Sequence, residues 1–458
     1  MPWMFDLAAE LQTFYDEHVR LGAERRSDLA AKRDLNLDRL RGGLDQLAQE
    51  TGKPHPYFRS TQNQGGYAMH TLNQDPDGAN GYDIDVAVIF NGSDLPDTAL
   101  AARQRARDAL LKKCATFADV PEARTNAVTI WYSEGYHIGF AVYRSTRDIW
   151  GNEKLEHAGT EWKTRSPAAV TDWFLEKVKA LSPTANPALN YNPKVKPDQF
   201  RRIVRFVKWF CRSRSEWSLP GGMIVSTLLA EGTYKPNPDR DDQSLYETLV
   251  ALRDRTANSK VYNPIDGSDL TAKSEIENQV KRLHRNLKKH IPKLDILFSQ
   301  KDCTRQKARS AWDWIFNHGY WADAEQTQIT KATDESQGVG LPNRVTIKCE
   351  LSRKENGKPY AEYKSGSSLL RKGLHLTFRI ADTNVIPPYD VEWAVTNEGD
   401  EAEDSRDLSW SRTSPVATTS TKYKGRQKMT CLIRRGGYVL AEANHIVRIA
   451  AGPFGSRY

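Results

Sequence analysis

The chain has 458 residues, of which 39% are hydrophobic and 27% charged, and its formal net charge is +8. This length suits two or three domains that each bury a core. No apolar run approaches the roughly 18 residues of a membrane span, and the N-terminus lacks the features of a signal peptide. We therefore expect a cytoplasmic protein that makes no membrane contact. The positive charge suits a polyanion such as a nucleoside triphosphate or a nucleic acid, although many soluble proteins are as basic for no specific reason.

Helical spacing of apolar residues covers the first 50 residues, and Gly52-Lys53-Pro54 ends that segment. The region 56–145 then changes character and is predicted to form a mixed α/β core. Its expected parts are a glycine turn at Gly65-Gly66, a strand over 83–90, a helix around 97–116, and a hairpin of strands 127–131 and 136–143.

A second, helical region extends from Ser166 to about His318. Its predicted helices cover 168–181, 197–212, 219–229, 242–255, 275–287 and 301–316. A stretch rich in Gln, Thr, Ser and Gly follows and is predicted to be a linker. Beyond it, alternating patterns predict a separate β domain. The predicted strands are 344–351, 374–380, 391–396, 429–433 and 446–449.

The expected fold class is therefore α+β. The expected domains are a catalytic lobe with N-terminal helices at 1–165, a helical lobe at 166–324, a linker at 325–339 and a β-rich domain at 340–458. The five cysteines form no CxxC pair, which argues against a zinc site or a disulfide framework.

Asp83 and Asp85 are the residues from which the chemistry is predicted. They stand two apart in the strand Asp83-Ile84-Asp85-Val86-Ala87-Val88. Side chains on a strand alternate between its faces, so both carboxylates project from the same face. Their mutual repulsion calls for a cation, and in-line nucleotidyl transfer uses two divalent ions, Mg²⁺ or Mn²⁺. The alternative is structural, with Asp83 only capping a turn.

Gly65 and Gly66 precede this strand and allow backbone N–H groups to approach phosphates closely. With the two aspartates they form an arrangement suited to a nucleoside triphosphate and metal. Tyr67 is a candidate for base stacking, although packing in the core is the simpler interpretation for an aromatic residue.

These motifs resemble those of the polymerase-β-type nucleotidyltransferases, and specifically the bacterial cGAS/DncV-like group (CD-NTases, SMODS domains). The resemblance is carried by Gln64-Gly65-Gly66-Tyr67 with Asp83-Ile84-Asp85, by the segment around Lys208, by Pro220–Glu231 and by Asn263-Pro264. Val391–Ala402, Tyr423-Lys424-Gly425 and Cys431 resemble the adenylyl/guanylyl-cyclase-and-SMODS C-terminal sensor domain.

The resemblance implies a polymerase-β-like catalytic lobe packed on a helical lobe, followed by a sensor domain. It implies an enzyme that converts NTPs into a cyclic or linear oligonucleotide messenger in bacterial antiphage defence (CBASS), and a separate effector protein that receives the messenger. Lys208 would contact the triphosphate, and Ser226 is a candidate contact to the nucleobase or ribose, unless it bonds back within its helix.

The third metal ligand of the family is missing. The family pattern places an Asp where this chain has Gly139, within Gly135-Tyr136-His137-Ile138-Gly139-Phe140. Glu134 lies too far along the chain to replace it, and His137, on the same strand face, is expected to pack or bond locally.

Three interpretations of the missing carboxylate remain open. The protein is an active enzyme in which water completes the metal coordination, or it is a degenerate nucleotide or nucleic-acid sensor, or the sequence is an inactivated variant of an enzyme. A template-independent polymerase is a further alternative.

The C-terminal region holds five candidates to line a ligand pocket, namely Trp393, Asn397, Trp410, Tyr423 and Arg426. Ordinary core packing explains Trp393 equally well.

Overall fold

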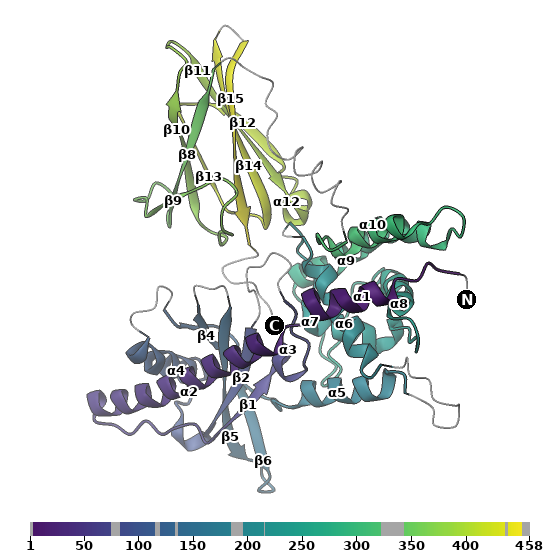
Figure 1. Ribbon diagram of the computed structural model, residues 1–458. Coiled ribbons are helices and arrows are strands. Elements are labelled where there is room, and N and C mark those ends of the chain that lie inside the picture. Colours follow the sequence, from purple (N-terminus) through teal and green to yellow (C-terminus); the bar gives the residue numbers. More distant parts are fainter. Residues whose placement is uncertain are drawn as a thin grey trace. The chain divides into compact units, whose positions relative to one another are not determined.

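The computed structural model describes residues 3–74, 83–114, 120–132, 136–184, 196–214, 216–321, 343–435 and 438–450. The chain divides into two compact units. Figure 1 labels their helices and strands. The N-terminal unit contains Asp6–Trp209 and Ile224–Ala272. The C-terminal unit contains Phe210–Met223 and Lys273–Tyr458, together with Met1–Phe5.

A seven-stranded sheet forms the centre of the N-terminal unit, with the strand order β1-β2-β5-β4-β3 and with β6 and β7 continuing from β5. Its strands are β1 (Ser60–Gln64), β2 (Asp83–Asn91), β3 (Glu122–Ala123), β4 (Val128–Trp131), β5 (His137–Arg147), β6 (Glu153–Ala158) and β7 (Trp162–Thr164). Strands β2 and β5 run parallel, and every other pair is antiparallel.

The two faces of this sheet differ in what covers them. Helices α2 (Ala23–Thr51) and α4 (Ala99–Lys113) bury one face against the even-numbered apolar residues of β2 and β5. The opposite face carries a smaller cluster that includes Ala87, Ile89, Ala141 and Tyr143. Because strand side chains alternate, Asp83 and Asp85 belong to this second face. The candidate site therefore lies on the side of the sheet opposite α2 and α4.

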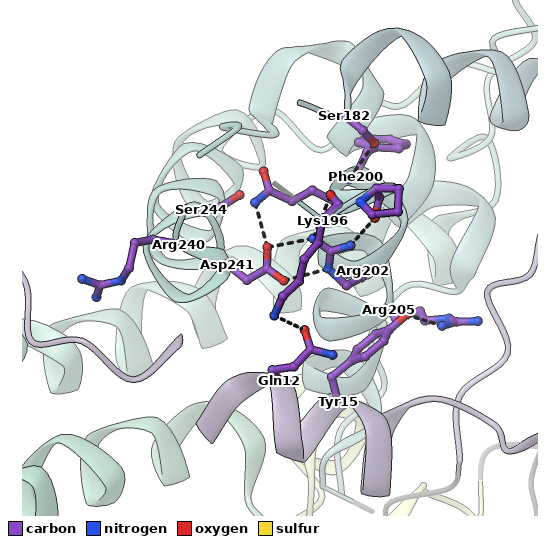
Figure 2. Close-up of polar contacts among 12 residues, drawn as sticks. Gln12, Tyr15, Ser182, Lys196, Phe200, Arg202, Arg205, Arg240, Asp241 and Ser244 are labelled. Atoms are coloured by element: carbon purple, nitrogen blue, oxygen red, sulfur yellow. Dashed lines mark hydrogen bonds and ion pairs between the residues drawn. The ribbon is translucent and has the colours of Figure 1, made fainter. Parts of the chain in front are cut away.

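The helical part of the N-terminal unit includes α1 (Ala8–Phe14), the π-helix η1 (Tyr15–Val19), α3 (Gly65–Ala68), α5 (Ala169–Leu181), α6 (Gln199–Arg212), α7 (Gly222–Leu228), η3 (Leu229–Thr233) and α8 (Asp241–Arg255). Helix α6 buries Phe200, Ile203, Val204, Phe206 and Val207 almost completely. Its polar side chains hold the neighbouring elements (Figure 2). Arg202 donates from Nε to Asp241 over 2.7 Å, and Arg205 donates to the hydroxyl of Tyr15.

The C-terminal unit combines helices with a β sandwich. Its helical elements are α9 (Ser274–His290), η4 (Ile291–Phe298), α10 (Arg305–Phe316) and α12 (Asp400–Asp404). One sheet has the order β13-β10-β8-β9 and the other β12-β11-β14-β15. The strands are β8 (Val345–Ser352), β9 (Ala361–Tyr363), β10 (His375–Thr383), β11 (Asp390–Glu398), β12 (Ser409–Thr413), β13 (Val416–Ser420), β14 (Gly425–Arg435) and β15 (Tyr438–Ile449). Apolar residues of both sheets, including Phe378 and Trp393, form one core.

Helix α9 carries the basic run Lys281–His290. Arg282 of this run is only 5% exposed and forms an ion pair with Asp404. The run is thus divided between buried and exposed positions, because the helix has to bury Leu283 and Leu287 as well.

The α+β class and the all-β C-terminal region confirm the expectation from sequence. Strand β2, helix α4 and the pairing of β4 with β5 occur where the patterns predict them. The short strands β1, β6 and β7 were not predicted, since their polar residues show no clear alternation of apolar and polar positions. The expected linker lies outside the described residues. All five cysteines are free thiols, as expected.

Candidate functional site

Asp83 and Asp85 lie at the start of β2, beside the start of β5. In the parallel pairing, Asp83 is opposite His137 and Asp85 is opposite Gly139. The pairing therefore puts Gly139, the position at which the sequence resemblance leads us to expect a third carboxylate, directly beside Asp85.

The carboxylate of Asp85 is enclosed between two glycines. A Cβ atom on Gly65 would lie 2.6 Å from Oδ2, and one on Gly139 would lie 2.8 Å from Oδ1. Burial, and then the charge of Asp83, raise the pKa of Asp85 to about 8. The pair therefore retains a proton at neutral pH, and a bound cation would take the place of that proton.

His137 is held against Trp131 on the adjacent strand β4. Their ring centroids are 4.4 Å apart, and Nε2 of His137 is 3.8 Å from Oδ2 of Asp83. This agrees with the expectation that His137 packs locally. Trp131 could not be predicted as a neighbour of His137, because their proximity depends on the register of β4 with β5.

The glycine turn forms the start of the short helix α3. Gly65 has a φ of +61°, a conformation that favours glycine. The N–H of Thr71 donates to the carbonyl of Gly66 over 2.8 Å, which closes the loop that follows α3. Tyr67 is partly buried against the sheet core, and the guanidinium of Arg26 lies 4.7 Å from its ring centroid. Its ring is therefore engaged by the protein itself.

Lys208 on α6 reaches this loop. Its Nζ donates to the carbonyl of Thr71 over 2.6 Å and lies 3.3 Å from the Thr71 hydroxyl. Arg205, one turn earlier, donates to the carbonyl of His70 over 2.6 Å. The structure thus brings Lys208 to the loop that begins at Gly65-Gly66. Thr71 and His70 were missed, because backbone carbonyls leave no signature in a sequence.

A cavity of about 620 Å³ adjoins Arg205, His70 and Tyr15. Much of the positive charge in its wall is already engaged in contacts within the protein (Figure 2). Lys196 donates to Gln12 over 2.8 Å, Arg201 pairs with Asp198, and Arg202 pairs with Asp241. These contacts tie α6 and the residues before it to α1 and α8, and the hydrogen bond from Arg205 to Tyr15 ties α6 to η1.

Helix α7 carries Ser226, the candidate contact to a nucleobase or ribose. Ser226 and Thr227 on α7 are each 1% exposed, and neither hydroxyl has a hydrogen-bond partner among the described residues. Ser226 is therefore buried, and its hydroxyl does not bond back to a carbonyl of its helix. Glu134 lies outside the described residues.

Two segments of the chain match families of known proteins. Residues 59–143 match the family described as "Cyclic GMP-AMP synthase DncV-like, nucleotidyltransferase domain", and residues 324–450 match the "Adenylyl/Guanylyl and SMODS C-terminal sensor domain". The chain therefore carries a DncV-like nucleotidyltransferase domain and an adenylyl/guanylyl and SMODS C-terminal sensor domain. The first of these two matches contains Asp83, Asp85 and Gly139.

A cyclic GMP-AMP synthase of Escherichia albertii is 23% identical to this protein over 395 residues, which cover 82% of this chain and 81% of that protein. The DncV cyclic AMP-GMP synthase of Vibrio cholerae has a TM-score of 0.53 at 15% identity, with 70% of this chain and 98% of that chain covered. The GTP-bound form of DncV has a TM-score of 0.54 at 13% identity, with the same coverage. These structures show that the fold is shared.

The donor set of this site fits a divalent cation incompletely. The adjacent carboxylates of Asp83 and Asp85, of which Asp85 has a raised pKa, suit a hard cation. However, the described residues contain no cluster of three or more His, Cys, Asp or Glu side chains placed to hold a metal.

Across the described ranges, no helix has the length and apolarity needed to cross a bilayer.

Proposed function

We propose that this protein is a metal-dependent nucleotidyltransferase that joins NTPs into a cyclic or linear oligonucleotide messenger for antiphage defence. The observation that carries the proposal is the placement of Asp85, with Asp83 two residues before it, directly against Gly65 of the phosphate-binding turn. A triphosphate held at that turn would have its charge beside both carboxylates, where a shared cation stabilises all of them.

Each residue has a role in this proposal. Asp83 and Asp85 would hold Mg²⁺ or Mn²⁺, two ions per site, which neutralise the triphosphate and lower the pKa of the attacking hydroxyl. Gly65 and Gly66 would leave room for the phosphates, and Lys208 would add positive charge to the same loop. Water would complete the coordination that Gly139 cannot provide. The messenger would act on a separate effector protein, and the reaction would take place in the cytoplasm.

The competing function is nucleotide binding without turnover. It is favoured by Gly139, which leaves the site one carboxylate short. Both functions predict that NTPs bind, so binding alone does not separate them.

The test is incubation with radiolabelled NTPs and Mg²⁺ or Mn²⁺, followed by separation of the products. We expect oligonucleotide products from the protein as it stands and none from the Asp83→Ala/Asp85→Ala variant. Activity only in Gly139→Asp would show that this sequence is an inactivated variant. Bound NTP without product in either form would refute the enzymatic proposal and support the sensor.

A further inference from the structure

The two sheets of the C-terminal sandwich enclose a polar cavity of about 290 Å³ at one end. Its wall includes residues of β10, β11, β12, β13 and β14, and among them are Asn397, Trp410, Tyr423 and Gln427. Three of the five residues predicted for a tail pocket, Asn397, Trp410 and Tyr423, therefore do line one. Trp393 is fully buried in the sandwich core, and Arg426 is not among the lining residues.

Asn397 and Gln427 occupy positions where a sandwich core is normally apolar. On β14 the inward-facing row continues from Gln427 through Met429 and Cys431, and both of those residues are fully buried. Asn397 is paired directly with Gln427 across the two strands. Burying two amide side chains at one end of an apolar row lowers the stability of the folded protein compared with apolar residues there. Their presence therefore points to a ligand.

A chain of hydrogen bonds orients these amides. Nε2 of Gln427 donates to Oδ1 of Asn397 over 2.9 Å, and Nδ2 of Asn397 donates to the carbonyl of Asp407 over 3.0 Å. This series of hydrogen bonds ends at Gln427, whose side chain is only 3% exposed. Its Oε1 atom is buried and accepts no hydrogen bond among the described residues. Gln427, whose Oε1 lacks a donor, is one of the residues that line the cavity.

Aromatic rings and charge define what fits beside this acceptor. Trp410 is opposite Val395 on β11 and so faces inward at the sheet edge. The hydroxyl of Tyr423 donates to Asp407 over 2.8 Å, which fixes its ring. The lining contains the carboxylates of Glu355 and Asp407 but only one ammonium group, that of Lys422, which is 3.3 Å from Asp407. A triphosphate would meet net negative charge here.

We propose that this cavity binds an uncharged nucleobase, either free or as a nucleoside, whose ring stacks on an aromatic side chain and whose N–H donates to Oε1 of Gln427. The volume lies at the lower end of the roughly 300–1,000 Å³ of small-molecule sites, which suits one nucleoside and not an oligonucleotide. Stacking on Trp or Tyr tolerates any base, so the polar groups would select among bases. The proposal does not depend on turnover at Asp83 and Asp85.

The test is isothermal titration of the full chain with adenosine, guanosine, cytidine and uridine, and with the corresponding free bases. We expect one-to-one binding of at least one of these compounds. Gln427→Leu, which extends the apolar row and should fold, is expected to weaken it about tenfold or more, as is Trp410→Ala. Thr430→Val, on the same strand and outside the cavity lining, is the control and should leave binding unchanged.

Comparison of each base with its nucleoside shows whether the ribose contributes. Absence of saturable binding at millimolar concentrations would overturn the proposal. So would binding that survives both Gln427→Leu and Trp410→Ala and is displaced by NTP, because such a nucleoside would bind at the proposed NTP site beside Asp83 and Asp85. Gln427→Leu is also assayed for oligonucleotide products from NTPs. If it forms them while nucleoside binding is lost, the cavity and the proposed nucleotidyltransferase site are tested independently.

Discussion

Gly139 lies against the carboxylate of Asp85, so that a Cβ atom at position 139 would be 2.8 Å from Oδ1. The space that a third aspartate would need is thus partly filled by the second one. Because the obstructing atom is the end of a side chain, a small rotation of Asp85 would admit a larger residue. The missing ligand and the position of Asp85 are therefore linked.

Gly139→Asp is expected to raise the affinity for Mn²⁺ at least tenfold, since a third carboxylate adds both a ligand and a negative charge. Paramagnetic resonance of free Mn²⁺ measures this directly, without turnover. Gly139→Asn is the matched control, because it adds similar bulk without charge. Its affinity for Mn²⁺ should increase much less than that of Gly139→Asp. Equal affinities for Gly139→Asp and the wild type would show that Asp85 does not rotate.

Gly65→Ala is expected to destabilise the protein more than Gly52→Ala. Both glycines have φ angles above +60°, but a Cβ at Gly52 meets nothing within 4 Å, whereas one at Gly65 meets Asp85. The backbone conformation alone costs about 1 kcal/mol, and displacement of Asp85 adds to it, for a total of about 2–3 kcal/mol. Urea unfolding measures both values. Equal losses would mean that Asp85 moves aside without cost.

Arg202→Met is expected to cost about 3–5 kcal/mol, because it leaves the largely buried carboxylate of Asp241 without its charged partner. The double variant Arg202→Met/Asp241→Leu should recover part of the loss. The exposed pair of Arg41 and Asp38 is the control, and Arg41→Met should cost less than about 1 kcal/mol. A double variant as unstable as the single one would contradict this account.

His445 should make the sandwich less stable in acid. Burial lowers the pKa of His445 to about 4, from 6.5, so the folded state excludes a proton that the unfolded chain binds. Its contribution is complete above pH 6.5 and is lost as the pH falls toward 4, by about 2 kcal/mol at pH 5. His445→Phe, beside Phe378 and Tyr363, should reduce that pH dependence in unfolding titrations at pH 7.5 and 5. An identical dependence in the variant would assign it to other groups.

Much of the site could be predicted from local sequence. The spacing of Asp83 and Asp85 puts both on one strand face, because alternation is a property of the strand itself. The β2 pattern and the glycine turn were equally visible. The positions of Ser226 and Tyr67 were harder to predict, because the depth of a helix in its core and the approach of Arg26 depend on distant packing.

The sequence by itself determined which groups are present: two carboxylates on one strand, a glycine turn before them, and a glycine where the resemblance led us to expect a third carboxylate. Only the tertiary structure decided that Gly65 and Gly139 flank the same carboxylate, since this follows from the pairing of β2 with both β1 and β5. It also decided that Asn397 and Gln427 are paired at the end of an apolar row. Strand register is a long-range property, and spacing along the chain does not encode which residues of two separate strands become neighbours.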